Sequence, residues 1–236
     1  MNCTKHHNLK NTMGADAGGV RFSFRCIITL MVATVFLISA VHADTLVLKP
    51  AHDGYTSASN SSVTWKTLQG AQGTGASNNQ GAIRLSYLVA SSVKDTYNIN
   101  TRAMLSFDTS KIPDDAVITN ATLSLQYLNK TVQLGGKTRI ALVAGSPASP
   151  AKYSSTDYSR YTKTDIAPRI NYSAITKGKI QFTLNKANLS VINKAGITTF
   201  TVLNGDDVDG VFSGKWSSGG VNILTAYGTT SAYPPT

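Results

Sequence analysis

The densest group of oxygen-bearing side chains is the run Asn-Gly-Asp-Asp-Val-Asp-Gly at residues 204–210. Calcium binds carboxylate and carbonyl oxygens supplied by tight loops, so Asp206, Asp207 and Asp209 are candidate calcium ligands. Their spacing is not that of an EF-hand, and the chain contains no Glu that could close such a loop. The alternative interpretation is a turn between strands, in which Asp and Gly serve backbone geometry alone.

Aromatic side chains in polar surroundings form a second group of candidates. Sugar-binding surfaces stack exposed aromatic rings on pyranose rings and use polar side chains for the hydroxyls. Trp65 and Trp216 lie among Ser, Thr, Gly and Lys residues, which is typical of loops or strand edges. Tyr158, Arg160 and Tyr161 combine aromatic rings with a cation. These five residues are candidate ligand-binding residues, and the alternative for each tryptophan is that it plugs the end of a core.

Residues suited to catalysis are few. Beyond residue 43 the chain has one histidine, His52, and no cysteine, which excludes a His/Cys metal site by count. His52 precedes Asp53-Gly54, a turn sequence in which a histidine is usually solvated. Pairs of carboxylates could hydrolyse glycosides, but most of the aspartates stand in turn contexts such as Asp114-Asp115. The sequence therefore predicts a protein that is not an enzyme.

The first 43 residues have the pattern of a secretory signal peptide. Arg21 and Arg25 precede an uncharged apolar run at residues 26–38, and small residues then lead to a cleavage site after Ala43. A membrane anchor is the competing interpretation, but the apolar run is shorter than the roughly 20 residues that a spanning helix needs. We expect a secreted, extracellular protein that is not attached to a membrane after cleavage.

Residues 44–236 are expected to form one domain. They contain 18 Lys and Arg against 11 Asp, a net charge of +7, and both cysteines precede the cut. This charge could attract acidic polysaccharide or an anionic cell surface, although it is also compatible with an ordinary basic surface. No basic run is dense enough to indicate nucleic acid as a partner.

Alternating hydrophobic residues predict antiparallel strands. In residues 101–108 Ala103, Leu105 and Phe107 share one face; Arg102 and Asp108 lie on the other and are expected to pair with neighbouring strands. One short helix is predicted at 185–196, and loops at 70–81, 145–170 and 204–210. The predicted fold is all-β, a jelly-roll β-sandwich. Its expected strands are 45–49, 63–69, 82–90, 101–108, 121–127, 137–144, 179–184, 198–203 and 221–227.

Five Asn-x-Ser/Thr sequons mark expected surface positions if the host glycosylates the protein. They fall at Asn60, Asn120, Asn129, Asn171 and Asn188.

A set of spaced residues resembles the signature of the DNRLRE-type domains, also classed as carbohydrate-binding module family 96. The likeness runs from about residue 46 to 236. It implies a jelly-roll sandwich of secreted proteins, often beside polysaccharide-degrading domains, that binds glycan without catalysis. The motif residues are Arg102-x-x-Leu105-x-Phe107-Asp108, Ile112-Pro113, Ile118, Ala121-Thr122-Leu123-x-Leu125, Phe182-x-Leu184-Asn185, Gly196-x-Thr198-x-Phe200, Asp207 and residues 223–233.

The chain departs from that family at two points. Thr109 stands where an apolar residue is usual, and such domains continue past Pro234-Pro235-Thr236 with a final apolar strand. The final strand is therefore expected to be missing, either because the sequence is a fragment or because another copy donates the strand. The leading hypothesis is a secreted, non-catalytic polysaccharide-binding module, with acidic glycans preferred. The alternative is a self-associating structural subunit of an extracellular matrix or filament.

Overall fold

The computed structural model describes residues 44–135, 138–176 and 178–236, and the predicted signal peptide lies outside the described residues. Strands dominate this part of the chain, which confirms the predicted all-β, sandwich-like fold. The strands are β1 (Pro50–Thr64), β2 (Gly75–Asn78), β3 (Ala82–Ala90), β4 (Thr96–Asp108), β5 (Thr122–Val132), β6 (Arg139–Ala144), β7 (Ile170–Asn171), β8 (Lys179–Thr183), β9 (Ile197–Asn204) and β10 (Val221–Tyr227).

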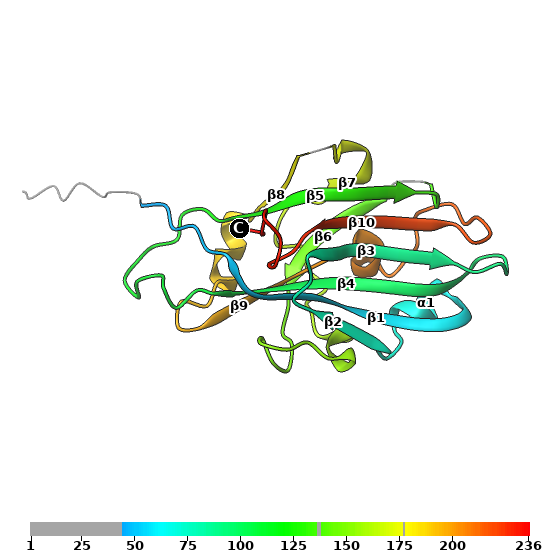
Figure 1. Cartoon of the computed structure of the whole chain (residues 1–236), viewed down its shortest axis with the longest axis horizontal. Helices are drawn as coiled ribbons and strands as arrows, with labels where there is room; N and C mark the ends of the chain where they lie inside the picture. Colours follow the sequence, from blue (N-terminus) through cyan, green and yellow to red (C-terminus); the bar gives the residue numbers. More distant parts are fainter. Residues whose placement is uncertain (1–43, 136–137, 177) are drawn as a thin grey trace, which may run out of the picture. The chain divides into compact units, whose positions relative to one another are not determined.

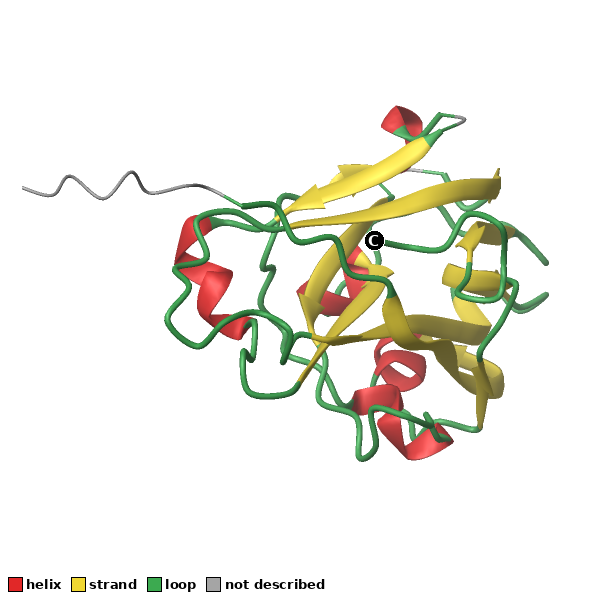
Figure 2. Cartoon of the chain, turned by 60° about the vertical axis from the view of Figure 1, so that its left-hand side comes forward, coloured by secondary structure: helices red, strands yellow, loops and turns green. Residues whose placement is uncertain are grey.

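In the described part of the chain, five short helical segments interrupt the connections between the strands (Figure 2). Two are α-helical and three are 3-10 turns. They are α1 (Trp65–Gln69), α2 (Gly205–Asp209), η1 (Ser155–Ser159), η2 (Tyr172–Ala174) and η3 (Lys186–Val191).

Strand β4 belongs to both layers of the sandwich. Its first half, up to Arg102, pairs with β3, and its second half, from Ala103, pairs with β9 on the same side. Strand β1 follows the other side of β4 along almost its whole length and pairs in turn with β2. The remaining order is β7-β6-β9-β4-β3-β10-β5-β8. Figure 1 shows β5, β10, β3, β4 and β1 side by side across the front layer.

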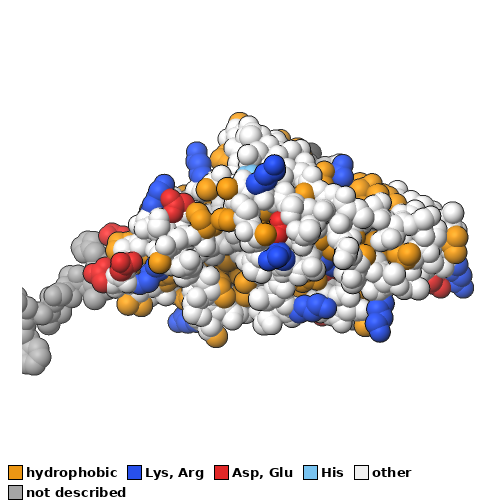
Figure 3. Space-filling model, turned by 90° about the horizontal axis from the view of Figure 1, so that it is seen from below, with side chains coloured by type: hydrophobic (Ala, Val, Ile, Leu, Met, Phe, Trp, Pro, Cys, Tyr) orange, Lys and Arg blue, Asp and Glu red, His pale blue; other side chains and the backbone are white. Residues whose placement is uncertain are grey.

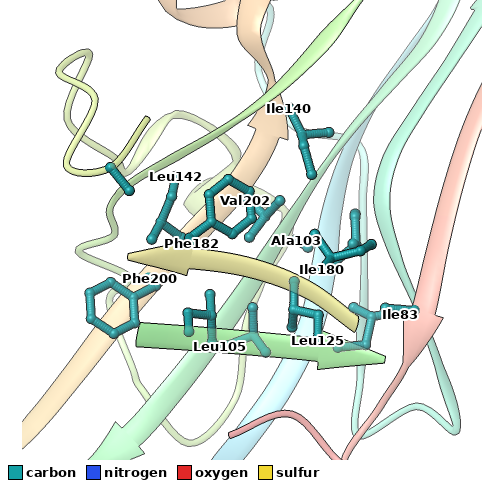
Figure 4. Packing of buried hydrophobic residues seen from close by; sticks show 14 of the residues in the cluster. Ile83, Ala103, Leu105, Leu125, Ile140, Leu142, Ile180, Phe182, Phe200 and Val202 are labelled. Carbon is teal, nitrogen blue, oxygen red and sulfur yellow. The ribbon is translucent and has the colours of Figure 1, made fainter. Parts of the chain in front are cut away.

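The main core lies between the two layers. Leu105 and Phe200 come from one layer and Leu125 from the other, and their side chains point into the same space as Phe182 (Figure 4). Burial of this apolar surface stabilises the fold by roughly 25 cal/mol per Å². The alternation predicted for residues 121–127 is confirmed in its buried members, because Leu123 and Leu125 are in the core.

Several local predictions were wrong. Residues 45–49 form no strand, and β1 instead extends from Pro50 to Thr64. Residues 63–69 are the end of β1 followed by α1, because the Thr64 hydroxyl accepts from the Thr67 amide and caps a helix. The predicted helix at 185–196 is only the 3-10 turn η3, for which Asn185 provides no side-chain cap. Residues 204–210 contain the helix α2.

Both faces of β4 are buried from Asn100 to Phe107. One face contributes to the main core, while the other is covered by α1, by η1 and by α2. This second face, with Arg102 at its centre, positions most of the residues that the sequence marked as candidates.

The last residue of the chain is paired with β5. Thr236 and Ser124 exchange both backbone hydrogen bonds, at 2.5 and 2.9 Å, as antiparallel partners do. The hypotheses of a missing final strand and of a strand donated by another copy stay predictions.

Candidate functional site

Trp65 is part of a second core at one end of the sandwich. Its side chain is 6% exposed and packs against Tyr97 and Phe212, with ring centroids 5.9 and 5.7 Å away. Leu68, one helical turn further along α1, is buried in the same cluster. The prediction that Trp65 is an exposed stacking surface was therefore wrong, because a five-residue helix turns the ring inward; the alternative of a plug at the end of the core holds.

Trp216 lies at the edge of this second core and is only partly buried. Its indole N–H donates to the backbone carbonyl of Thr96 at 3.1 Å. That hydrogen bond fixes the ring and satisfies its polar atom within the protein, while part of the ring stays at the surface. Of the two tryptophans, Trp216 is therefore the one whose ring a ligand can reach.

Arg102 is the centre of a buried polar network on the second face of β4. Its guanidinium donates to both carboxylate oxygens of Asp207, Nη2 to Oδ1 at 2.7 Å and Nε to Oδ2 at 3.2 Å. It also donates to the backbone carbonyls of Tyr158 at 2.6 Å and Gln69 at 2.9 Å. The Asn100 amide donates to the same carboxylate and to the Tyr158 hydroxyl. One arginine thus connects β4 with α1, η1 and α2.

The charge state of this network is fixed by its pairing. Burial is the largest single influence and acts to lower the pKa of Arg102, but the Asp207 carboxylate together with the neighbouring Tyr158 and Tyr161 outweighs it and raises the pKa above its ordinary value. Burial also raises the pKa of the Tyr158 hydroxyl. The arginine is therefore charged and the tyrosine neutral at any physiological pH, and the pair has no proton to exchange.

Tyr158 and Tyr161 belong to this network and not to an open binding surface. The Arg102 guanidinium lies 3.6 Å from the centre of the Tyr158 ring and 4.7 Å from that of Tyr161. Tyr158 is fully buried, so the prediction that it is an exposed ligand contact was wrong. Tyr161 is half-buried, and burial raises its pKa to about 12. Arg160 does reach the surface, with its side chain 50% exposed and Nε 3.5 Å from an Asp157 oxygen.

The three candidate calcium ligands have separate protein partners. Asp207 is paired with Arg102, and the Asp206 carboxylate accepts hydrogen bonds from the backbone and hydroxyl of Ser213. Asp209 binds Arg169 through both oxygens at 2.7 Å. Within the ranges that the structure describes, no three His, Cys, Asp or Glu residues are grouped so that they could hold a metal ion together. Calcium binding stays a prediction that this geometry does not favour.

The carboxylates of Asp206 and Asp209 respond oppositely to their surroundings. Burial raises the pKa of Asp206, although hydrogen bonds from Ser213 act against it. The hydrogen bonds from Arg169 lower the pKa of Asp209. The fold therefore favours the protonated form of Asp206 and the ionised form of Asp209, although both lie on one short helix.

The sequence context of His52 suggested a solvated turn residue, and this prediction was wrong. It lies within β1, is buried, and its Nε2 is 2.7 Å from the Asn78 side-chain oxygen. Its ring also contacts the edge of Tyr153, with the centroids 4.7 Å apart. The extended β1 strand replaces the expected turn and carries the imidazole inward.

The sequons differ in exposure. Asn120, Asn129 and Asn171 are exposed, while Asn60 and Asn188 are partly buried. The Asn188 amide nitrogen donates to the carbonyl of Asp165 at 3.3 Å, a bond that an attached glycan would disturb.

Comparison with known proteins adds no relative: no protein-family model matches the chain, and neither does any curated protein. In the part of the chain that the structure describes, no helix has both the length and the apolar character needed to cross a membrane. The fold and the site together define an all-β, sandwich-like protein with a buried Arg102–Asp207 pair.

Proposed function

We propose that this protein is a secreted, non-catalytic module that binds polysaccharide at its surface. The observation that carries the proposal is Trp216, a partly exposed ring whose N–H already has a partner inside the protein. A ring held in this way can stack on a sugar without losing a hydrogen bond and with little loss of side-chain freedom.

The charge distribution supports an acidic glycan as the preferred ligand. Several aspartates are held by internal partners, as Asp207 is by Arg102 and Asp209 by Arg169, whereas many lysines extend into solvent. On the underside of the molecule, blue basic side chains are scattered and outnumber the red acidic ones (Figure 3). Such an excess attracts polyanions over about a Debye length, roughly 8 Å at physiological salt.

Affinity electrophoresis through gels that contain single polysaccharides tests the proposal. The unmodified protein should be retarded by at least one polysaccharide, and Trp216→Ala should reduce that retardation by about tenfold in affinity, which is the value of a stacking contact near 1.4 kcal/mol. Tyr233→Ala removes another exposed aromatic ring and is the matched control. Equal retardation of all three proteins would show that Trp216 is not the contact, and absence of retardation in every gel would contradict the function itself.

A further inference from the structure

The connection between β4 and β5, residues 109–121, carries an exposed apolar side chain. Val117 is 83% exposed, more than any other large hydrophobic residue in the part of the chain that the structure describes. The connection lies at the left end of the molecule in Figure 1, beyond the end of β4. Single exposed valines are common on protein surfaces, so what distinguishes Val117 is the surface beside it.

The residues on both sides of Val117 in the sequence line a pocket. Ala116 and Ile118 contribute from this connection, and the other lining residues come from η3 and the segment that follows it. The pocket volume of about 220 Å³ is below the roughly 300–1,000 Å³ of small-molecule sites. The pocket therefore suits one aliphatic side chain better than a cofactor. Its lining residues are Ala116, Ile118, Leu189, Ser190, Ile192 and Lys194.

Lys194 holds the backbone beside Val117 in place. Its ammonium donates to the carbonyl of Asp114 and to that of Ala116, the latter at 3.0 Å. The Ala116 amide donates to the carbonyl of Pro113 at 3.0 Å, which closes a turn directly before Val117. Both the exposed valine and one wall of the pocket are therefore fixed before any partner arrives, so little conformational entropy would be lost on binding.

An apolar knob and a hole that lie side by side on one surface are self-complementary. When a two-fold axis passes between them, the knob of each copy enters the hole of the other, and both contacts form at once. A head-to-tail arrangement would instead leave one knob and one hole free at its two ends and would grow into a chain. Val117 is adjacent to its own pocket, which favours the closed arrangement.

Exposed charges of both signs stand near the lining residues in the sequence. They belong to Lys111, Asp114, Asp115 and Lys186. The net charge of +7 opposes the association of two copies in general, but these four charges cancel, and the Lys194 ammonium is bound by carbonyls of its own chain. A polyanion or an anionic bilayer would find little to attract it here, so the fitting partner is another copy of this chain.

We propose that the protein forms a closed two-fold dimer in which Val117 of each copy occupies the pocket of the other. One pair of such contacts covers far less than the roughly 1,200 Å² of a stable interface. The dimer is therefore of the weak, exchanging kind, with a Kd on the order of 0.1 mM.

The dimer is independent of polysaccharide binding. Trp216 is bonded to Thr96 at the start of the 13-residue strand β4, whereas the proposed interface follows the end of that strand, about 40 Å away at 3.3 Å per residue. The two Trp216 rings would stay free, and one dimer could hold a polymer at two points, which raises its avidity.

Sedimentation equilibrium over a concentration series tests the proposal. The protein is secreted from a host that does not glycosylate, because the sequons at Asn120 and Asn188 lie close to the pocket in the sequence. The unmodified protein should change from monomer to dimer and stop there. Val117→Ser should weaken dimerisation about a hundredfold, because two buried valines are lost and each is worth about tenfold. Val211→Ser removes a valine that is 68% exposed elsewhere and should leave the dimer unchanged.

A second variant tests the hole. Ala116→Leu fills the pocket and leaves Val117 in place, so it should also weaken the dimer. A mixture of Val117→Ser and Ala116→Leu regains one of the two contacts, because the first variant keeps the hole and the second keeps the knob. The mixture should therefore contain more dimer than either variant alone.

The remaining outcomes overturn the proposal. They are a protein that stays monomeric at about ten times the expected Kd, growth beyond the dimer, a dimer that Val117→Ser leaves intact, and equal losses in the Val117 and Val211 variants. Growth would indicate head-to-tail association, and the last two results would place the interface elsewhere. Polysaccharide binding is measured separately by gel retardation, so its failure and that of the dimer are distinguishable.

Discussion

Two arginines of this protein are each stacked on two tyrosines, but they differ in burial, in their distances to the rings and in whether a carboxylate pairs with them. Arg102 is fully buried, with ring centres at 3.6 and 4.7 Å and a carboxylate partner 2.7 Å away. Arg84 is exposed, with ring centres at 5.1 and 4.9 Å and no carboxylate partner in the described chain. The same side-chain chemistry therefore locks the fold in one place and leaves donors available in the other.

The difference shows how burial assigns a role to a charge. A buried guanidinium must find its counterion within the protein, because desolvation without pairing costs several kcal/mol. An exposed one keeps its hydration and can exchange water for a ligand at small cost. Variants that remove one partner from each arrangement measure this contrast.

The largest expected effect follows from removing the buried counterion. Asp207→Asn leaves the Arg102 charge unpaired in the interior and should lower the free energy of unfolding by about 3–5 kcal/mol. Urea denaturation followed by tryptophan fluorescence measures it. Asp209→Asn breaks a partly exposed pair with Arg169 and should cost less than about 1 kcal/mol. Similar losses in the two variants would mean that burial does not set the value of the pair.

A double variant separates an unpaired charge from lost packing. Arg102→Met combined with Asp207→Leu removes both charges, so its stability should lie closer to that of the unmodified protein than Asp207→Asn does. Additive losses would show that the hydrogen bonds to Gln69 and Tyr158, and not charge pairing, carry the stabilisation.

The sequence predicted the fold class because period-two alternation reports the buried face of a strand. In β5 that rule held for Leu123 and Leu125. In β4 it identified Ala103, Leu105 and Phe107 as core but implied that the opposite face was solvated or paired with strands. That face is buried because segments far away in the chain cover it, and a local pattern contains no information on distant cover.

The same limit explains the outcome for the site. Arg102 was expected to pair with a neighbouring strand, whereas its partner Asp207 comes from a helix about a hundred residues later. A polar strand face and an aspartate-rich segment are both visible in the sequence, but nothing local couples them. Arg84 was not singled out at all, because a bulge that realigns it with Tyr87 leaves no residue signature in a run such as Ile-Arg-Leu-Ser-Tyr.

An intermediate effect concerns pH and the buried Asp206. The fold raises the pKa of Asp206, so as pH rises the unfolded chain loses this proton before the folded protein does. The stability that the protonated form provides is therefore lost as pH rises from the ordinary pKa of 3.8 through the raised pKa of the folded state. Asp206→Asn cannot titrate, so its stability relative to the unmodified protein should increase across that window. Asp209 acts in the opposite sense, since its lowered pKa provides stability that is lost as pH falls. Thermal unfolding from pH 3 to 7 distinguishes the two aspartates. If the melting temperatures of the variants and the unmodified protein changed in parallel with pH, both pKa shifts would be contradicted.

The smallest expected effect on stability belongs to Arg84. Its contacts with Tyr55 and Tyr87 are exposed cation–π contacts, worth about 0.5–1 kcal/mol, and no buried partner depends on them. Arg84→Gln should therefore unfold within about 1 kcal/mol of the unmodified protein in urea. A loss as large as that of Asp207→Asn would show that Arg84 holds the layers together, as Arg102 does. A near-neutral result means instead that the fold keeps an ordered cation between two rings without needing it for stability, and an ordered group that the fold does not need is available for a ligand.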